Sequence, residues 1–240
     1  MGQSERRPGG LVQNIIDFFK RKKHLYVAPI FFLFIAAGII FASGLLYDRF
    51  LDPTHEPVEM DLSAPDYDFS GQTIVIDPGH GGKDPGATSI SGVTEDQIVF
   101  SIAEELESIL TSNGAKVILT RDRDTFASLD DRKVEGDLFI SLHSDAMDDA
   151  SISGFTTYYT HPEQQAFAES INNALDAHSY FYNRGVGTMN FQVTWQLDYP
   201  AVLIELGYLS NTVDDMSLTE TRYQSMMAAG IAKGINNYLN

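Results

Sequence analysis

Hydrophobic residues along the chain fall into one long uninterrupted run followed by a series of short runs. The long run covers residues 25–47, which are 23 positions without a charged side chain. As a helix this run would be about 34 Å long, enough to cross a hydrocarbon core of about 30 Å. A cleavable signal peptide is the competing interpretation, but its apolar region usually has only about 7–15 residues. The pattern therefore predicts a retained transmembrane helix.

Strand-like and helix-like runs alternate through residues 71–240. Strands are predicted at 74–76, 115–120, 137–142, 154–160 and 200–206, and helices at 94–113, at about 160–178 and around the closing apolar stripe of Tyr223, Met226, Met227, Ile231 and Ile235. Such alternation is typical of an α/β domain. We therefore expect one α/β domain over residues 71–240, preceded by the transmembrane helix.

Polar stretches separate these runs. Residues 48–70 contain three prolines and many acidic residues without a regular period, which predicts an extended linker. Thr94–Gln97 fits a capping box that starts a helix. We interpret residues 121–133 as a charged surface loop, residues 183–185 as a turn, and residues 187–197 as loop and strand over the mouth of the domain.

Charge divides the chain into two parts. Of its 16 Lys and Arg and 33 Asp and Glu residues, six basic and two acidic ones lie in residues 1–47, so the rest carries ten basic and 31 acidic residues. Because the basic cluster precedes the apolar run, the positive-inside rule places residues 1–24 in the cytoplasm and the larger part of the protein outside. The part of the chain after residue 47 is so acidic that it would repel the phosphates of a nucleic acid, which excludes nucleic acid as a partner.

Four ionisable residues stand at the ends of predicted elements. His80 and His143 follow apolar strands, Glu205 is embedded in the apolar run Pro200–Leu206, and Glu95 starts a helix. Each has an ordinary structural alternative. The histidines fit a surface turn or a buried structural site, Glu95 fits an acid that interacts with a helix dipole, and Glu205 fits an outward-facing position on an edge strand. We expect His55, His161 and His178 to be solvated rather than ligands.

Together these four residues have the composition of a catalytic metal site. Strand ends and helix starts converge on one edge of an α/β sheet. The chain has no cysteine, so a metal must use His, Asp or Glu, and two histidines with one glutamate are a ligand set for catalytic zinc. Bound water then has a pKa near 7, and a further carboxylate can take its proton. Composition alone leaves the two glutamates unassigned, although the rigid helix start favours Glu95 as ligand and Glu205 as base.

Four separated motifs carry a family resemblance. IDPGHGGKDPGA (76–87), Glu95, FISLHSDA (139–146) and PAVLIELGYLSN (200–211) resemble the zinc-dependent N-acetylmuramoyl-L-alanine amidases, which cut peptidoglycan. The resemblance covers residues 71–240 and implies a mixed, mostly parallel sheet flanked by helices. It further implies Zn²⁺ held by His80, Glu95 and His143, with Glu205 as the catalytic carboxylate. The implied substrate is the amide between the lactyl group of N-acetylmuramic acid and L-alanine, on the wall side of the cell membrane.

The sequence departs from that family at two places. Asp145 stands where the family often has Asn, and the segment between Arg132 and His143 is a few residues shorter than usual. Two alternatives therefore accompany the amidase: a catalytically weak, membrane-tethered peptidoglycan-binding protein, and a zinc peptidase that acts on stem peptides. The sequence identifies no protein activator, no oligomeric state and no cellular process.

Overall fold

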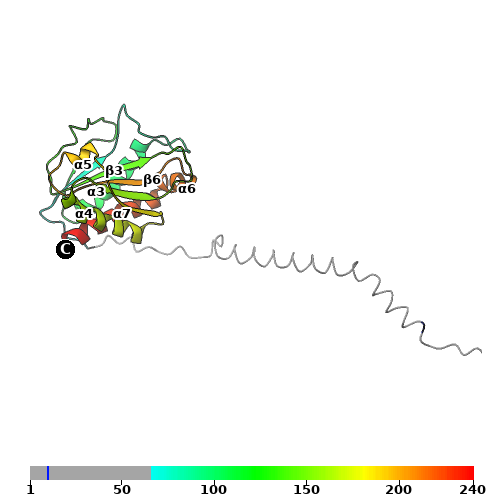
Figure 1. Cartoon of the computed structure of the whole chain (residues 1–240). Coiled ribbons are helices and arrows are strands. Elements are labelled where there is room, and N and C mark those ends of the chain that lie inside the picture. Colours follow the sequence, from blue (N-terminus) through cyan, green and yellow to red (C-terminus); the bar gives the residue numbers. More distant parts are fainter. Residues whose placement is uncertain (1–9, 11–65) are drawn as a thin grey trace, which may run out of the picture. The chain divides into compact units, whose positions relative to one another are not determined.

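A computed structural model of the chain describes residues 10 and 66–240 (Figure 1). The predicted transmembrane helix (25–47), almost all of the basic segment 1–24 and most of the linker lie outside these residues. In the described part, no helix has both the length and the apolar character needed to cross a membrane. Ala64–Asn240 forms one compact unit. Phe69, which the sequence pattern assigns to the linker, is instead fully buried in the core of this unit.

Strands and helices alternate along this unit, as expected. The order is β1 (Thr73–Pro78), α3 (Glu95–Ser112), β2 (Lys116–Leu119), β3 (Leu138–Asp145), β4 (Phe155–Tyr159), the short 3₁₀ helix η1 (Pro162–Gln164), α4 (Gln165–His178), β5 (Asn183–Thr188), α5 (Gln192–Trp195), β6 (Ala201–Tyr208), α6 (Thr212–Leu218) and α7 (Thr221–Leu239). The stretch between β2 and β3 contains no helix.

The strands form one six-stranded sheet in the order β2-β1-β3-β6-β4-β5. Neighbouring strands run parallel except for β4 and β6, which are antiparallel. The prediction of an α/β fold with a mixed, mostly parallel sheet flanked by helices is therefore confirmed.

The two faces of the sheet have different coverings. Side chains alternate between faces along a strand. Ile74 and Ile76 belong to the large core cluster with residues of α3, α4 and α7, whereas Val75 belongs to a smaller cluster with Val193 of α5 and Leu197. In Figure 1, α4 and α7 lie on one side of the sheet and α5 on the other. The three long helices thus cover one face, and loops with α5 cover the other.

The polar residues of the central strands belong to the face away from the long helices. In β3, Leu138, Ile140 and Leu142 pack in the large cluster, so Ser141 and His143 point the other way. In β6, Val202, Ile204 and Leu206 pack in the large cluster, so Glu205 also points away from it. The register pairs His143 with Glu205. The long helices therefore stabilise the sheet without covering these side chains.

Two segments differ from the sequence-based expectation. Residues 183–185, predicted as a turn, begin β5, where the register with β4 shifts between Phe155 and Thr157. Asn183 accepts a hydrogen bond from the Gly185 amide at 2.7 Å, and Gly185 has a φ of 93°. Residues 183–185 therefore have the composition of a turn although they form an irregular start of a strand. Residues 187–197 contain the end of β5 and a loop, as expected, but also the short helix α5, which the sequence analysis did not predict.

Candidate active site

The backbone at His80 adopts a conformation that is unusual for a residue with a side chain. Beyond the end of β1 at Pro78, the φ angles of His80, Gly81 and Gly82 are 58°, 115° and 60°. Among the residues that the structure describes, His80 is the only non-glycine with positive φ. This conformation costs about 1–2 kcal/mol. The His80 and His143 ring centroids are 5.0 Å apart.

Glycines beside His80 leave room for the other side chains of the site. A Cβ atom on Gly79 would lie 2.3 Å from Cε1 of His143. A Cβ atom on Gly86 would lie 2.5 Å from Oε2 of Glu95. Both distances are far below van der Waals contact, so the glycine-rich sequence after β1 is needed for the close approach of these side chains.

His80, Glu95 and His143 meet at one point. Glu95 Oε1 lies 3.1 Å from His80 Nε2 and 3.0 Å from His143 Nδ1. One ligand atom from each of the three residues lies within 4.8 Å of the others. The structure therefore brings together the three residues that the sequence analysis named as metal ligands.

Glu95 is held by the backbone as well as by the histidines. Its Oε2 accepts the Ala87 amide at 2.9 Å, and its Oε1 accepts the Ser144 amide at 3.0 Å. The residue is only 4% exposed, so it is not a solvated acid of a first helical turn. The predicted capping box does not form: the Thr94 hydroxyl oxygen accepts no hydrogen bond from a backbone amide of the first helical turn, and the hydroxyl donates to Asp96.

The close contacts among these groups change their proton affinities. The hydrogen bond to Glu95 raises the pKa of His80 to about 9, in spite of partial burial. Burial alone would raise the pKa of Glu95, but the hydrogen bonds from His143 and His80 hold it well below its usual range. In the metal-free protein a proton on His80 thus balances the charge of Glu95. A divalent cation can take the place of that proton.

Asp84 orients His80, a role that the sequence analysis missed. Its Oδ2 lies 3.0 Å from His80 Nδ1, which leaves Nε2 directed at Glu95. A carboxylate on the far nitrogen is the usual second partner of a metal-binding histidine. The signal was present in the sequence, because Asp84 follows His80 by four residues within the same glycine-rich turn.

Glu205 lies beside the three residues. It is the cross-strand partner of His143, and its Oε2 is buried without a hydrogen-bond partner in the described structure. Burial, together with the negative charges of Glu95 and Asp145, outweighs the attraction of His143 and raises the pKa of Glu205 to about 7. Glu205 therefore carries a carboxyl group that changes protonation near neutral pH. The exposed Asp145, a departure from the family pattern, contributes to this shift.

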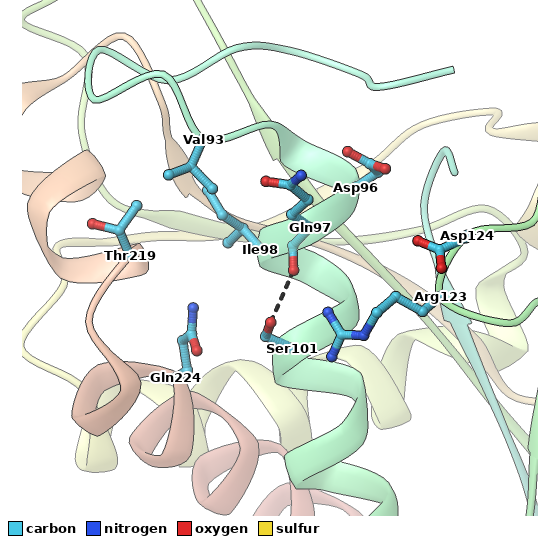
Figure 2. Close-up of a pocket in the computed structure, with 9 residues that line it drawn as sticks. All are labelled: Val93, Asp96, Gln97, Ile98, Ser101, Arg123, Asp124, Thr219 and Gln224. Carbon is cyan, nitrogen blue, oxygen red and sulfur yellow. Dashed lines mark hydrogen bonds between the residues drawn. The ribbon is translucent and has the colours of Figure 1, made fainter. Parts of the chain in front are cut away.

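A cavity of about 210 Å³ opens next to the two histidines. It is lined by His80, Asp84, Phe126, Ala127, Leu129, Arg132, His143 and Val193. A larger pocket of about 420 Å³ (Figure 2) contains none of the four candidate residues and is lined by Asp96, Gln97, Ser101, Arg123 and neighbouring residues. The smaller cavity is the one that reaches the titratable cluster.

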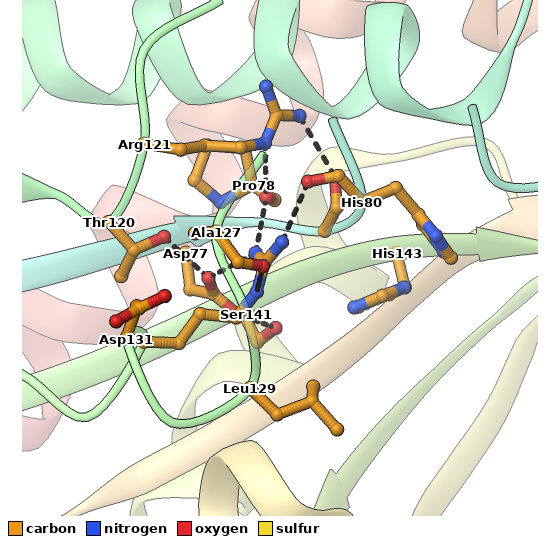
Figure 3. A network of polar contacts seen from close by, with 12 residues as sticks. Asp77, Pro78, His80, Thr120, Arg121, Ala127, Leu129, Asp131, Ser141 and His143 are labelled. Atoms are coloured by element: carbon orange, nitrogen blue, oxygen red, sulfur yellow. Dashed lines mark hydrogen bonds and ion pairs between the residues drawn. The ribbon is translucent and has the colours of Figure 1, made fainter. Parts of the chain in front are cut away.

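The interpretation of residues 121–133 as a surface loop was wrong at its two ends. Arg121 and Arg132 are 5% and 4% exposed, and both donate to carbonyl oxygens of the turn that carries His80. Figure 3 shows Arg121 at this turn. Arg132 also pairs with the fully buried Asp77 at 2.7 Å. A charged run without hydrophobic periodicity gives no sign that its arginines point inward, so sequence reasoning missed Arg121 and Arg132. It missed Asp77 as well, because the partner of this residue lies in that run.

Other histidines remain apart from this cluster, as expected. His161 Nε2 lies 2.9 Å from the Trp195 carbonyl oxygen, and His178 Nδ1 lies 2.8 Å from that of Ala174. His55 lies outside the described residues. Within residues 66–240, only His80, Glu95 and His143 form a group that could hold a metal ion.

The donor set fits a zinc ion. Two imidazoles and one carboxylate are the ligands of a catalytic zinc site with an open fourth position. Their ligand atoms already lie within 4.8 Å of one another, and Glu205, the cross-strand partner of His143, has a buried, unpartnered Oε2. A cation or a water molecule there would satisfy polar groups that are costly to bury alone.

Comparisons with known proteins identify the family of this chain. A family profile described as N-acetylmuramoyl-L-alanine amidase matches residues 74–237. A probable cell wall amidase, LytH of Staphylococcus epidermidis, is 38% identical over 189 residues, which is 78% of this chain and 65% of that protein. The chain thus spans just under two thirds of the length of that relative.

Solved structures show the same fold. The catalytic domain of CwlV, an N-acetylmuramoyl-L-alanine amidase from Bacillus (Paenibacillus) polymyxa var. colistinus, matches with a TM-score of 0.68 and 35% identity over 70% of this chain and 98% of that one. The amidase AmiC2 of Nostoc punctiforme matches with a TM-score of 0.67 and 34% identity over 71% and 98%. The chain therefore belongs to the N-acetylmuramoyl-L-alanine amidase family.

Proposed function

We propose that the protein is a zinc-dependent hydrolase of peptidoglycan. The bond that it hydrolyses would be the amide between the lactyl group of N-acetylmuramic acid and the L-alanine of the stem peptide. The observation that supports this most directly is the meeting of His80, Glu95 and His143 within 4.8 Å, with Glu205 opposite His143. Membership of the amidase family supports the choice of bond.

Zinc would be held by His80, Glu95 and His143. When bound, it supplies a Lewis acid and lowers the pKa of a coordinated water molecule. Asp84 orients the His80 ring, and the Ala87 and Ser144 amides fix both oxygens of Glu95. These contacts hold the ligands in place before any metal arrives, which reduces the entropy lost on binding.

Glu205 would act as the proton carrier. An amide is cleaved only if its leaving nitrogen gains a proton, and a group with a pKa near the working pH both accepts and donates protons efficiently. Burial raises the pKa of Glu205 to about 7. We infer that Glu205 takes a proton from the attacking water and delivers it to the amine of L-alanine.

We also propose that residues 25–47 anchor the protein in the cell membrane, with the N-terminus in the cytoplasm and the catalytic domain facing the wall. The 23 uncharged residues that follow a basic cluster support this topology. Membrane fractionation of cells that express the full chain or a version without residues 25–47 tests the anchor. We expect only the full chain in the membrane fraction after a high-salt wash.

The decisive experiment is digestion of purified peptidoglycan with the full chain in detergent, with and without a zinc chelator. Intact stem peptides with a free L-alanine amine, identified by mass spectrometry, are expected only without the chelator, and added zinc should restore their release. Shortened peptides would identify a zinc peptidase instead. Binding to peptidoglycan without any release, in a protein that contains zinc, would identify a wall-binding protein.

A further inference from the structure

The turn that carries His80 needs an external support. His80, Gly81 and Gly82 all have positive φ, and the conformation of His80 is unfavourable for a residue with a Cβ atom. A ligand at such a position keeps its place only if the surrounding structure holds the backbone. The contacts of the turn therefore determine where the imidazole lies.

Two buried arginines provide those contacts. Arg132 donates to the carbonyl oxygens of Pro78 at 2.9 Å and His80 at 2.7 Å. Arg121 donates to those of Pro78 at 2.8 Å and Gly79 at 2.9 Å. Three successive carbonyl groups are thus bound by guanidinium groups. Figure 3 shows the His80 carbonyl directed at this network and the His80 ring on the other side, near His143.

Asp77 fixes the position of Arg132. Its Oδ1 accepts from Arg132 at 2.7 Å and from the Thr120 hydroxyl at 2.5 Å, and its Oδ2 accepts from the Ser141 hydroxyl at 2.6 Å. Asp77 is fully buried, and its bonds with Arg132 and Ser141 are buried as well. Hydrogen bonds between charged groups are stronger than neutral ones and hold geometry well.

The same carboxylate connects the strands of both histidines. Asp77 lies three residues before His80, and Ser141 lies two residues before His143 on the same side of β3. Ser141 is the direct cross-strand neighbour of Asp77. A displacement of Asp77 or Arg132 would therefore change the distance between the two imidazoles.

We propose that Arg132, paired with Asp77, is a positioning residue that sets the affinity of the site for its metal ion. It acts through the backbone of His80 and touches no ligand atom. The inference depends on the proposed function, since it takes His80 to be a zinc ligand. An ordinary buried ion pair would stabilise the fold without any particular effect on the metal.

The test compares full-length Arg132→Lys with the wild-type chain. Lysine keeps the positive charge beside Asp77 but cannot bind Asp77, Pro78 and His80 with a planar fork. The matched control is Arg123→Lys in the same loop, because Arg123 is exposed and pairs on the surface with Glu104. Zinc affinity is measured by competition with a chelating dye, and thermal unfolding is measured on the metal-free proteins.

We expect Arg132→Lys to weaken zinc binding by about 10–100-fold, the range seen for outer partners of metal ligands. The visible absorption spectrum of bound Co²⁺ should also change, because it reports ligand geometry. Arg123→Lys should bind zinc within about twofold of the wild type. If Arg132→Lys unfolds at a lower temperature yet binds zinc as the wild type does, the pair is only structural and the inference is rejected.

A second variant tests the inference if Arg132→Lys does not fold. The double variant Asp77→Asn/Arg132→Gln removes both buried charges together, which avoids leaving one unpaired. Weaker zinc binding by this folded variant supports the inference, and unchanged binding rejects it. If neither variant folds, the pair is a requirement of the fold itself and the narrower role is rejected. Absence of zinc binding by the wild type would instead reject the proposed function.

Discussion

Glu205 lies directly opposite His143 on the neighbouring parallel strand, and both point away from the long helices. Glu205 contributes a carboxyl group with one buried, unpartnered oxygen, and His143 contributes an imidazole bound to Glu95. The two residues thus present different chemistry at one place in the sheet. His143, a candidate metal ligand, and Glu205, a candidate proton carrier, therefore lie on adjacent strands at the same level of the sheet.

Replacement of Glu205 by glutamine tests the proton carrier. We expect Glu205→Gln to reduce the release of stem peptides by about 10²–10⁴-fold, since an amide neither accepts nor donates the proton. Zinc affinity should stay close to that of the wild type. Glu163→Gln, at an exposed position of η1, is the control and should keep full activity. A Glu205→Gln variant that loses its zinc would instead indicate a ligand role.

The raised pKa of Glu205 predicts a pH-dependent stability of the metal-free protein. Its value rises from 4.5 to about 7 on folding, so the folded state binds the proton more tightly than the unfolded state. Stability from this group is therefore complete below pH 4.5 and is lost as the pH rises through 7. The loss amounts to about 3 kcal/mol.

Urea unfolding from pH 4 to pH 8 measures this effect as the difference between the wild type and Glu205→Gln. The other titrating groups cancel in that difference. A constant difference across the range would show that Glu205 has an ordinary pKa in the folded protein.

Zinc binding should release a proton from His80. The pKa of His80 is raised to about 9, so its imidazole is protonated at pH 7 in the metal-free protein, and a metal ligand must be neutral. We expect about one proton per zinc ion from this group, and an affinity that falls about tenfold per pH unit below 9. Calorimetry at pH 7 in buffers of different ionisation enthalpy counts the protons. A proton count at pH 7 that does not differ from zero would show that His80 is neutral in the metal-free protein.

Gly79 should tolerate no side chain. A Cβ atom there would lie 2.3 Å from the His143 ring, so Gly79→Ala must move that ring or the turn. We expect zinc affinity to fall by at least tenfold while the protein still folds, since the clash involves one ring at the edge of a cavity. Gly230→Ala in α7, whose nearest contact is Leu175 at 3.1 Å, is the control and should bind zinc normally.

Periodic hydrophobic runs and glycine-rich turns made most of the fold and the titratable cluster predictable. His80 was predictable because it follows an apolar strand, and His143 and Glu205 because they lie in apolar runs that form neighbouring parallel strands. The carboxyl ends of such strands meet at a common edge. Arg121 and Arg132 were not, because burial of an arginine depends on carbonyl groups distant in the sequence. The start of β5 was missed for a related reason, since pairing with β4 outweighs the turn-like composition of residues 183–185.

Because the two faces of the sheet are covered differently, substitutions in the main core and substitutions beside the cavity affect different parts of the domain. The large core cluster lies with α3, α4 and α7, while the cavity beside His80 is bordered by Phe126, Leu129 and Val193 on the opposite face. Substitutions on that rim alter the space beside the two histidines without disturbing the main core. The shape of the cavity beside His80 can therefore change while the core that stabilises the domain stays the same.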